Sequence, residues 1–165
     1  MTVELGQITL VAALLTAISL GLFPLIGTYT GNKRMVAMAS SAAMIQALLV
    51  AIAFGILTSA FVIQDFSVEY VARHSNSLLP MHYRYSAVWS AHEGSLLLWE
   101  LILALWTAAV VLFSKRLPEV FKARVLAILG WISVGFLLFI LLTSNPFGRL
   151  IPSAVEGMDL NPLLQ

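Results

Sequence analysis

Four long apolar runs constrain this chain more than any other feature of its sequence. Each run is longer than about 18 residues and almost free of charge, which is enough for a helix to cross the hydrocarbon core of a bilayer. The runs cover about residues 5–29, 35–63, 95–113 and 125–143. The sequence therefore predicts an all-α, polytopic membrane bundle of four transmembrane helices, with a long loop between the second and third.

Composition excludes the other broad classes of protein. Hydrophobic residues make up 60% of the 165 residues and charged residues 10%, whereas about 25% of a typical soluble domain is charged. A disordered chain would be far less apolar. Cysteine is absent, so this chain forms no disulfide, zinc–thiolate site or CxxC redox motif. The net charge of +1 gives no basis for binding nucleic acid.

The basic residues predict the orientation of the bundle. Six of them lie in the two short connections between helices: Lys33, Arg34, Lys115, Arg116, Lys122 and Arg124. Short loops rich in Lys and Arg stay in the cytoplasm. We therefore expect both termini, the loop 64–94 and the tail 144–165 on the opposite, periplasmic side. The first run is too long and its start too poor in basic residues for a cleavable signal peptide.

Small residues spaced four apart mark two of the predicted helices. The second helix has six of them, from Ala39 to Ser59, and the first has Ala13, Ala17 and Gly21. Small residues let helix backbones approach closely in lipid, so we expect a close-packed stripe along each helix. Two isolated amides in the apolar runs, at Gln7 and Gln46, predict hydrogen bonds between helices.

The three histidines, His74, His82 and His92, all lie on the predicted outer side. Neutral imidazole is a common metal or haem ligand. A solvated loop histidine is the simpler interpretation for His74 and His82. The sequence contains no zinc motif of the HExxH type.

His92 lies in a distinctive segment, Trp89-Ser-Ala-His-Glu-Gly-Ser-Leu-Leu-Leu-Trp99, at the outer mouth of the third predicted helix. Gly94 or Ser95 is placed to cap that helix. Glu93 would lie beside the positive end of the helix dipole, which stabilises a carboxylate.

Glu100 lies about 10 Å deeper than Glu93 in the same helix, at a rise of 1.5 Å per residue. An ionisable group at that depth is costly and is a functional hypothesis by default. Two interpretations stay open: a functional carboxyl, as in a small transporter or proton-coupled carrier, or a carboxyl paired with another polar group of the bundle.

The two outer segments differ in their patterns. Residues 65–71 partly alternate polar and apolar side chains, which predicts an extended segment. The tail from Asn145 is rich in Pro and Gly and is predicted to be a loop.

Several stretches together resemble the N-terminal part of the CcmF family of cytochrome c maturation proteins. The first is the run Tyr85-Ser-Ala-Val-Trp-Ser-Ala-His-Glu-Gly-Ser-Leu-Leu-Leu-Trp99. The others are residues 4–7, 115–125, 143–150 and 159–165. The resemblance covers the whole chain in register. It is shared by the related proteins that serve nitrite reductase maturation.

The resemblance implies a haem lyase component in the bacterial inner membrane. The family takes haem from the haem chaperone CcmE and, with CcmH, helps attach it to apocytochrome c through thioether bonds at the periplasmic face. Its members are several times longer and hold haem as a cofactor. The first periplasmic haem histidine follows the Asn-Pro-Leu-Leu-Gln motif, so haem ligands are expected beyond Gln165 and this chain alone is expected to be inactive.

Seven residues match the family signature without an assigned role: Trp89, His92, Glu93, Gly94, Trp99, Asn161 and Pro162. The resemblance gives this chain no catalytic residue and no metal ligand. Glu100 falls where the family has a plain apolar residue.

We expect the loop around Tyr83, Arg84, Tyr85 and Trp89 to form part of a surface for the apolar ring and charged propionates of haem. Two alternatives stay open. One is a haem lyase subunit of the nitrite reductase maturation type. The other is a split structural subunit that has no haem site of its own and assembles with the remainder of CcmF.

Overall fold

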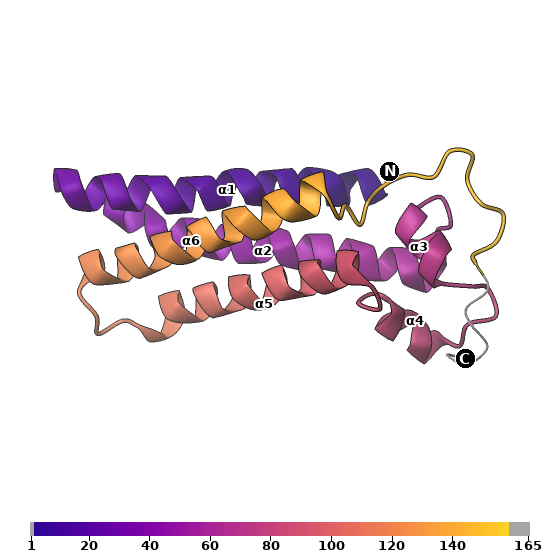
Figure 1. Cartoon of the computed structure of the whole chain (residues 1–165). Coiled ribbons are helices and arrows are strands. Elements are labelled where there is room, and N and C mark those ends of the chain that lie inside the picture. Colours follow the sequence, from indigo (N-terminus) through magenta and orange to yellow (C-terminus); the bar gives the residue numbers. More distant parts are fainter. Residues whose placement is uncertain (1, 159–165) are drawn as a thin grey trace.

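The computed structural model describes residues 2–158 and contains four long helices (Figure 1). They are α1 (Thr2–Thr30), α2 (Lys33–Ile63), α5 (His92–Phe113) and α6 (Glu119–Leu142). All four are long and apolar enough to cross a membrane, which confirms the predicted all-α bundle of four spans. The last helix begins six residues earlier than about residue 125, because Pro118 precedes its first turn and Glu119 lies near its positive end.

The small residues of α1 bring its backbone close to that of α6. Ala13, Ala17 and Gly21 are all buried. A Cβ atom built on Gly130 of α6 would lie 3.0 Å from the backbone nitrogen of Gly21 and 3.2 Å from the carbonyl oxygen of Ala17. The predicted close-packed stripe on α1 is therefore confirmed.

The corresponding stripe on α2 covers only half of the predicted length. Its first three members, up to Ala47, are buried, and its last three, from Ala51 to Ser59, are exposed. A helix has 3.6 residues per turn, so a strict four-residue spacing drifts around the axis by about 40° at each step. The prediction of a single face is wrong for this reason, and the buried face continues through Val50, Ala53 and Leu57.

The two amides in the spans have different environments. Gln46 makes the predicted contacts between helices, with side chains of α5 and α6. Oε1 of Gln7 is buried and has no hydrogen-bond partner among the described residues, so the interhelical bond predicted for Gln7 does not form there.

Residues 64–91 and 143–158 pack together at one end of the bundle, and we call them the outer cap. The cap contains two short helices, α3 (Glu69–His74) and α4 (Met81–Ala87). The extended segment predicted for residues 65–71 is wrong from Glu69 onward, since α3 begins there and buries Tyr70 and Val71 side by side. Among the described residues, the only strand-like pairing in this segment is a single antiparallel bridge between Val68 and Arg149.

The tail is irregular over its described residues and lies against the loop of the cap. The Glu69 amide donates to the Gly148 carbonyl at 2.9 Å, and the Met158 amide donates to the Ala72 carbonyl at 2.7 Å. Nη2 of Arg149 lies 2.6 Å from Oε1 of Glu4. These contacts fix the tail to α3 and to the start of α1.

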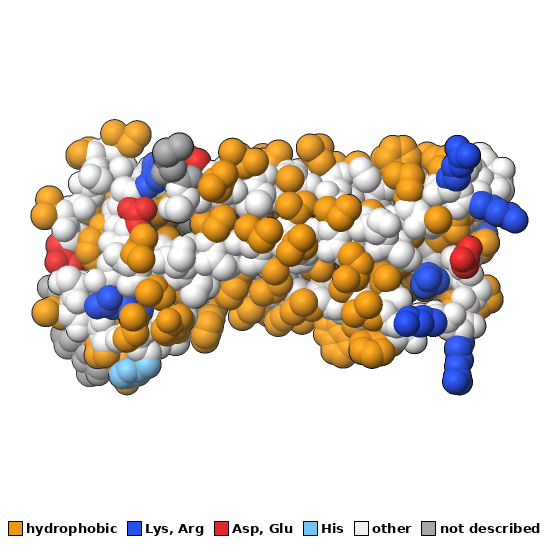
Figure 2. All heavy atoms as spheres, turned by 180° about the vertical axis from the view of Figure 1, so that it is seen from behind, with side chains coloured by type: hydrophobic (Ala, Val, Ile, Leu, Met, Phe, Trp, Pro, Cys, Tyr) orange, Lys and Arg blue, Asp and Glu red, His pale blue; other side chains and the backbone are white. Residues whose placement is uncertain are grey.

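Charge is distributed unevenly between the two ends. In Figure 2, most of the visible Lys and Arg side chains gather at one end, while a histidine and most of the visible acidic side chains lie at the other. The end rich in Lys and Arg holds the α1–α2 and α5–α6 connections (Figure 1). The outer cap and the N-terminus lie at the opposite end (Figure 1).

Candidate functional site

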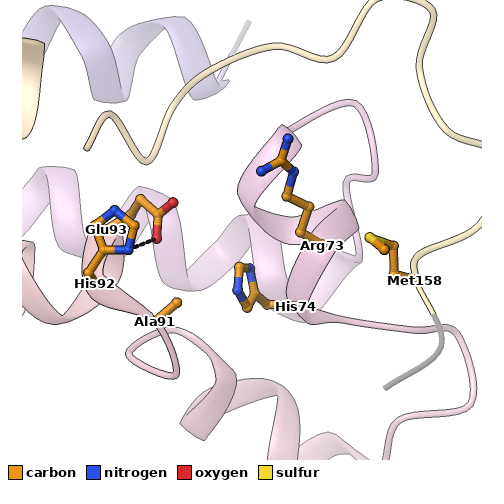
Figure 3. A pocket seen from close by; sticks show the side chains of 6 residues that line it. All are labelled: Arg73, His74, Ala91, His92, Glu93 and Met158. Carbon is orange, nitrogen blue, oxygen red and sulfur yellow. Dashed lines mark ion pairs between the residues drawn. The ribbon is translucent and has the colours of Figure 1, made fainter. Parts of the chain in front are cut away.

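A pocket of about 460 Å³ lies in the outer cap, where α3 and the start of α5 meet the tail (Figure 3). Its lining residues come from three separate parts of the chain: Arg73, His74, Ala91, His92, Glu93 and Met158. Two of them, His92 and Glu93, belong to the family signature. The pocket is therefore the place where the signature segment meets the rest of the cap.

His92 and Glu93 form the first turn of α5. Nδ1 of His92 lies 3.3 Å from Oε2 of Glu93, with the imidazole 67% exposed and the carboxylate 22% exposed. The helix begins at His92, and its N-cap residue Ala91 makes no side-chain capping bond. The predicted cap at Gly94 or Ser95 is therefore wrong. The Ser95 hydroxyl donates instead to the Trp89 carbonyl at 2.8 Å.

At Gly94 the backbone of α5 comes very close to the backbone of the loop before it. A Cβ atom at this position would lie 1.7 Å from the Val88 carbonyl oxygen. The Tyr70 hydroxyl donates to the same oxygen at 2.9 Å and accepts from the Ala91 amide at 3.4 Å. Burial raises the pKa of the Tyr70 phenol, so this hydroxyl stays a neutral donor. The signature residue Gly94 therefore has no side chain because the Val88 backbone lies where a Cβ atom would be.

The other two histidines have different surroundings. Nδ1 of His74 lies 3.0 Å from the Tyr70 carbonyl oxygen, and its ring lies 4.8 Å from that of Tyr70, centroid to centroid. His74 is half-buried on the pocket, so the solvated interpretation is wrong for it. His82 is exposed, as predicted, and its ring centroid lies 4.2 Å from that of Tyr83.

Arg84 holds the loop of the cap together. Its Nε, Nη1 and Nη2 atoms donate to the carbonyls of Leu79 at 2.9 Å, Val62 at 3.3 Å and Ser77 at 3.3 Å. All three guanidinium nitrogens are therefore engaged by backbone, and we assign Arg84 to loop structure instead of the predicted contact with haem propionates. Tyr83, Tyr85 and Trp89 remain exposed nearby.

Trp99, another signature residue, does not line the pocket. Trp99 is 62% exposed on α5, as expected of a tryptophan that faces lipid or the interface. Asn161 and Pro162 lie outside the described residues.

The lining of this pocket differs from that expected of a resident haem site. Four of the six residues that line the pocket are charged or titratable, whereas pockets for large apolar ligands have mainly apolar and aromatic walls. Within residues 2–158, no group of three His, Cys, Asp or Glu side chains could hold a free metal ion; haem iron, by contrast, takes only one or two axial ligands from the protein. The site is suited to a polar or charged group that can face Arg73 or Glu93.

Sequence reasoning missed three residues around this site. Tyr70, Arg73 and Met158 lie far from His92 and Glu93 in sequence, and folding brings them close to that pair. The one local signal was the spacing of Glu69 and Arg73, which pair at 2.5 Å one helical turn apart.

Known proteins resemble this chain in both sequence and fold. A family model described as cytochrome C assembly protein matches residues 89–165. CcmF of Pseudomonas aeruginosa is 56% identical over 163 residues, which cover 98% of this chain and 25% of that protein. NrfE of Haemophilus influenzae, also a cytochrome c-type biogenesis protein, is 43% identical over 162 residues, covering 98% of this chain and 26% of NrfE.

A solved structure of the cytochrome c haem lyase CcmF has the same helix arrangement. It matches with a TM-score of 0.85 and 29% identity, over 91% of this chain and 25% of that structure. The chain spans about a quarter of the length of the curated relatives that it matches. The agreement extends over nearly the whole chain in both sequence and fold, and the chain belongs to the CcmF family of cytochrome c-type biogenesis proteins.

Proposed function

We propose that this chain is part of a haem lyase that matures c-type cytochromes. The observation that carries the proposal is the 56% identity to a CcmF protein over 98% of the chain. The whole protein takes haem from the chaperone CcmE and, with CcmH, presents it to the cysteine thiols of apocytochrome c. Haem is the cargo of this reaction, and the remainder of CcmF supplies its ligands.

In this proposal the chain lies in the bacterial inner membrane with the outer cap in the periplasm. The charge distribution supports this orientation, since the two short connections opposite the cap hold six of the basic residues. Both described ends of the chain then face the periplasm. Haem attachment would occur on the same side.

The part played by this chain is to build a rigid outer surface. The loop between α2 and α5 is held at its centre by Arg84, and it displays Tyr83, Tyr85 and Trp89, which are 51%, 47% and 46% exposed. Exposed aromatic side chains supply large contact areas at low entropic cost. We assign these three to contact with haem in transit or with a protein partner.

Complementation tests the function directly. The full-length protein that contains this chain is expressed in a bacterial strain without its own CcmF, and covalently bound haem is measured on c-type cytochromes after denaturing electrophoresis. We expect covalent haem to return. Membrane-inserted protein without covalent haem would contradict the proposal.

The aromatic surface is tested in the same strain. Trp89→Ala is expected to lower the yield of covalent haem several-fold, whereas Trp106→Ala, which is 68% exposed on α5 and lies outside the outer cap, leaves it unchanged. Equal yields for the two variants would show that the exposed aromatic surface does not contribute to haem attachment.

The nitrite reductase type of haem lyase is the second candidate. The 43% identity to NrfE is consistent with it, but the 56% identity to CcmF is higher. We therefore expect complementation to restore general c-type cytochromes. Restoration confined to the nitrite reductase would favour the second candidate.

A further inference from the structure

A polar cluster lies inside the helix bundle, away from the pocket and the exposed aromatic surface. It consists of Gln46 on α2, Glu100 on α5 and Ser133 on α6, which we call the polar triad. Their side chains are 1%, 0% and 1% exposed. Each residue comes from a different spanning helix, so the triad joins three helices within the apolar region.

The hydrogen bonds of the triad are short and shared. The Ser133 hydroxyl donates to Oε1 of Glu100 at 2.5 Å. Nε2 of Gln46 donates to Oγ of Ser133 at 2.6 Å and to Oε1 of Glu100 at 3.2 Å. Of the two interpretations left open for Glu100, the structure thus supports a carboxyl paired with other polar groups.

The triad has too few hydrogens to give every one of its oxygens a hydrogen-bond partner. Both hydrogens of the Gln46 amide and the single hydroxyl hydrogen of Ser133 are already used. Two acceptor oxygens remain buried without a partner, Oε1 of Gln46 and Oε2 of Glu100. None of the ion pairs found among the described residues includes Glu100. An ionised Glu100 would therefore leave an uncompensated charge in the membrane, which is costly.

We propose that Glu100 is a proton-binding site within the membrane, with its proton on Oε2 and donated to Oε1 of Gln46. The two side chains already share one N–H···O bond, and an acid and a primary amide that share one such bond can close a ring with a second, O–H···O. The added hydrogen gives both orphan oxygens a partner. The triad is then neutral, and every donor and acceptor in it is satisfied.

This inference is independent of the proposed haem lyase function. The ligand is a single proton, held by residues that touch neither the pocket nor the aromatic surface. Its role is to join α2, α5 and α6 without placing a charge in lipid. A failed complementation experiment would leave it intact, and its own failure would leave the family assignment intact.

Infrared spectroscopy of the full-length protein in lipid at neutral pH tests the proposal. We expect a C=O stretching band of a protonated carboxyl that disappears in Glu100→Gln. The matched control is Glu119→Gln, which alters an exposed carboxyl at the start of α6 and leaves the band in place. Loss of an ionised carboxylate band in Glu100→Gln, with no loss of a protonated one, would overturn the proposal.

Thermal unfolding of two variants distinguishes a protonated Glu100 from an ionised one. Glutamine reproduces the donor and acceptor of a protonated acid but not the charge of a carboxylate. We expect Glu100→Gln to keep the melting temperature of the parent and Glu100→Ala to lower it. A Glu100→Gln protein that unfolds as readily as Glu100→Ala would contradict the proposal.

Discussion

The helix bundle and the outer cap are held together by different physical means. In the bundle, small residues such as Gly21 and Gly130 let helices approach closely, and the polar triad lies within a mainly apolar interior. In the cap, side chains bind backbone groups of distant segments. Arg84 binds three carbonyls and the Tyr70 hydroxyl binds a fourth.

The difference follows from where backbone hydrogen bonds are made. A spanning helix satisfies its own backbone, because lipid offers no partners, so the size of its side chains decides how it packs. The cap has much irregular backbone, and its polar groups need partners from elsewhere in the chain. Substitutions should therefore act through shape in the bundle and through hydrogen bonding or close backbone contact in the cap.

The largest loss of stability is expected at Gly94, where the loop of the cap meets the first turn of α5. Gly94→Ala places a Cβ atom 1.7 Å from the Val88 carbonyl oxygen, and relieving this overlap should cost about 3 kcal/mol of unfolding free energy. The matched control is Gly55→Ala on α2, where nothing lies within 4 Å. That variant should gain about 0.5–1 kcal/mol, because alanine favours a helix. Unfolding in detergent measures both variants, and equal stabilities would contradict the close contact between Gly94 and the Val88 carbonyl.

The next effect tests hydrogen bonding in the cap. Arg84→Lys replaces a fork that reaches three carbonyls with one ammonium group, so the loop should lose about 2 kcal/mol of local stability. Hydrogen exchange of the amides in residues 75–79 measures this loss. Arg116→Lys, which is exposed at the opposite end, should change nothing. Unchanged exchange in Arg84→Lys would show that the loop does not depend on these bonds.

A smaller effect is expected for polar groups in the bundle. Gln46→Leu removes the donor to Ser133 and Glu100 and should lower stability by about 1 kcal/mol. Gln7→Leu is the control, since Oε1 of Gln7 is buried without a partner among the described residues, and its loss should be neutral or stabilising. Unfolding of both variants in the same detergent decides between them. A larger loss at Gln7 than at Gln46 would reverse the interpretation of the triad.

The smallest effect is expected when low pH weakens the contact between the tail and the loop of the cap. The Ser77 amide, which donates to Oε1 of Glu156 at 2.9 Å, holds the pKa of this carboxyl below its usual range. Since the folded-state pKa is the lower one, the contact contributes stability above the unfolded pKa. This contribution is lost as pH falls through the folded one. The NMR shift of the Ser77 amide should follow this loss.

Glu156→Gln provides the control for the acid effect. The variant has no carboxyl at this position, so the acid-dependent shift of the Ser77 amide should disappear. An unchanged shift in the variant would assign the titration to another group.

The spans were predictable because hydropathy and length are local properties of the sequence. A close-packed face on α1 was also predictable from Ala13, Ala17 and Gly21, but its partner, α6, was not. The stripe on α2 was predictable only in its first half, because a four-residue spacing does not keep to one face of a helix and the helix period moves Gly55 and Ser59 away from it.

The candidate site was less predictable because folding assembles it from distant segments. The sequence singled out His92 and Glu93, but nothing in it linked them to Arg73 or Met158. In the triad, Gln46 and Glu100 each stood out as polar residues in apolar runs. Ser133 did not, since serine is unremarkable in a membrane helix, and its role depends on which face of α6 meets α5.

The orientation of the cap is the central claim, because the proposed chemistry requires the cap and the cytochrome to share the periplasm. This chain has no cysteine, so single cysteines can be introduced into the full-length protein with any others replaced. Ser153→Cys lies in the cap and Lys115→Cys at the opposite end, both exposed. A membrane-impermeant maleimide applied to spheroplasts should label Ser153→Cys at once and Lys115→Cys only after the membrane is permeabilised. The reverse pattern would contradict the account.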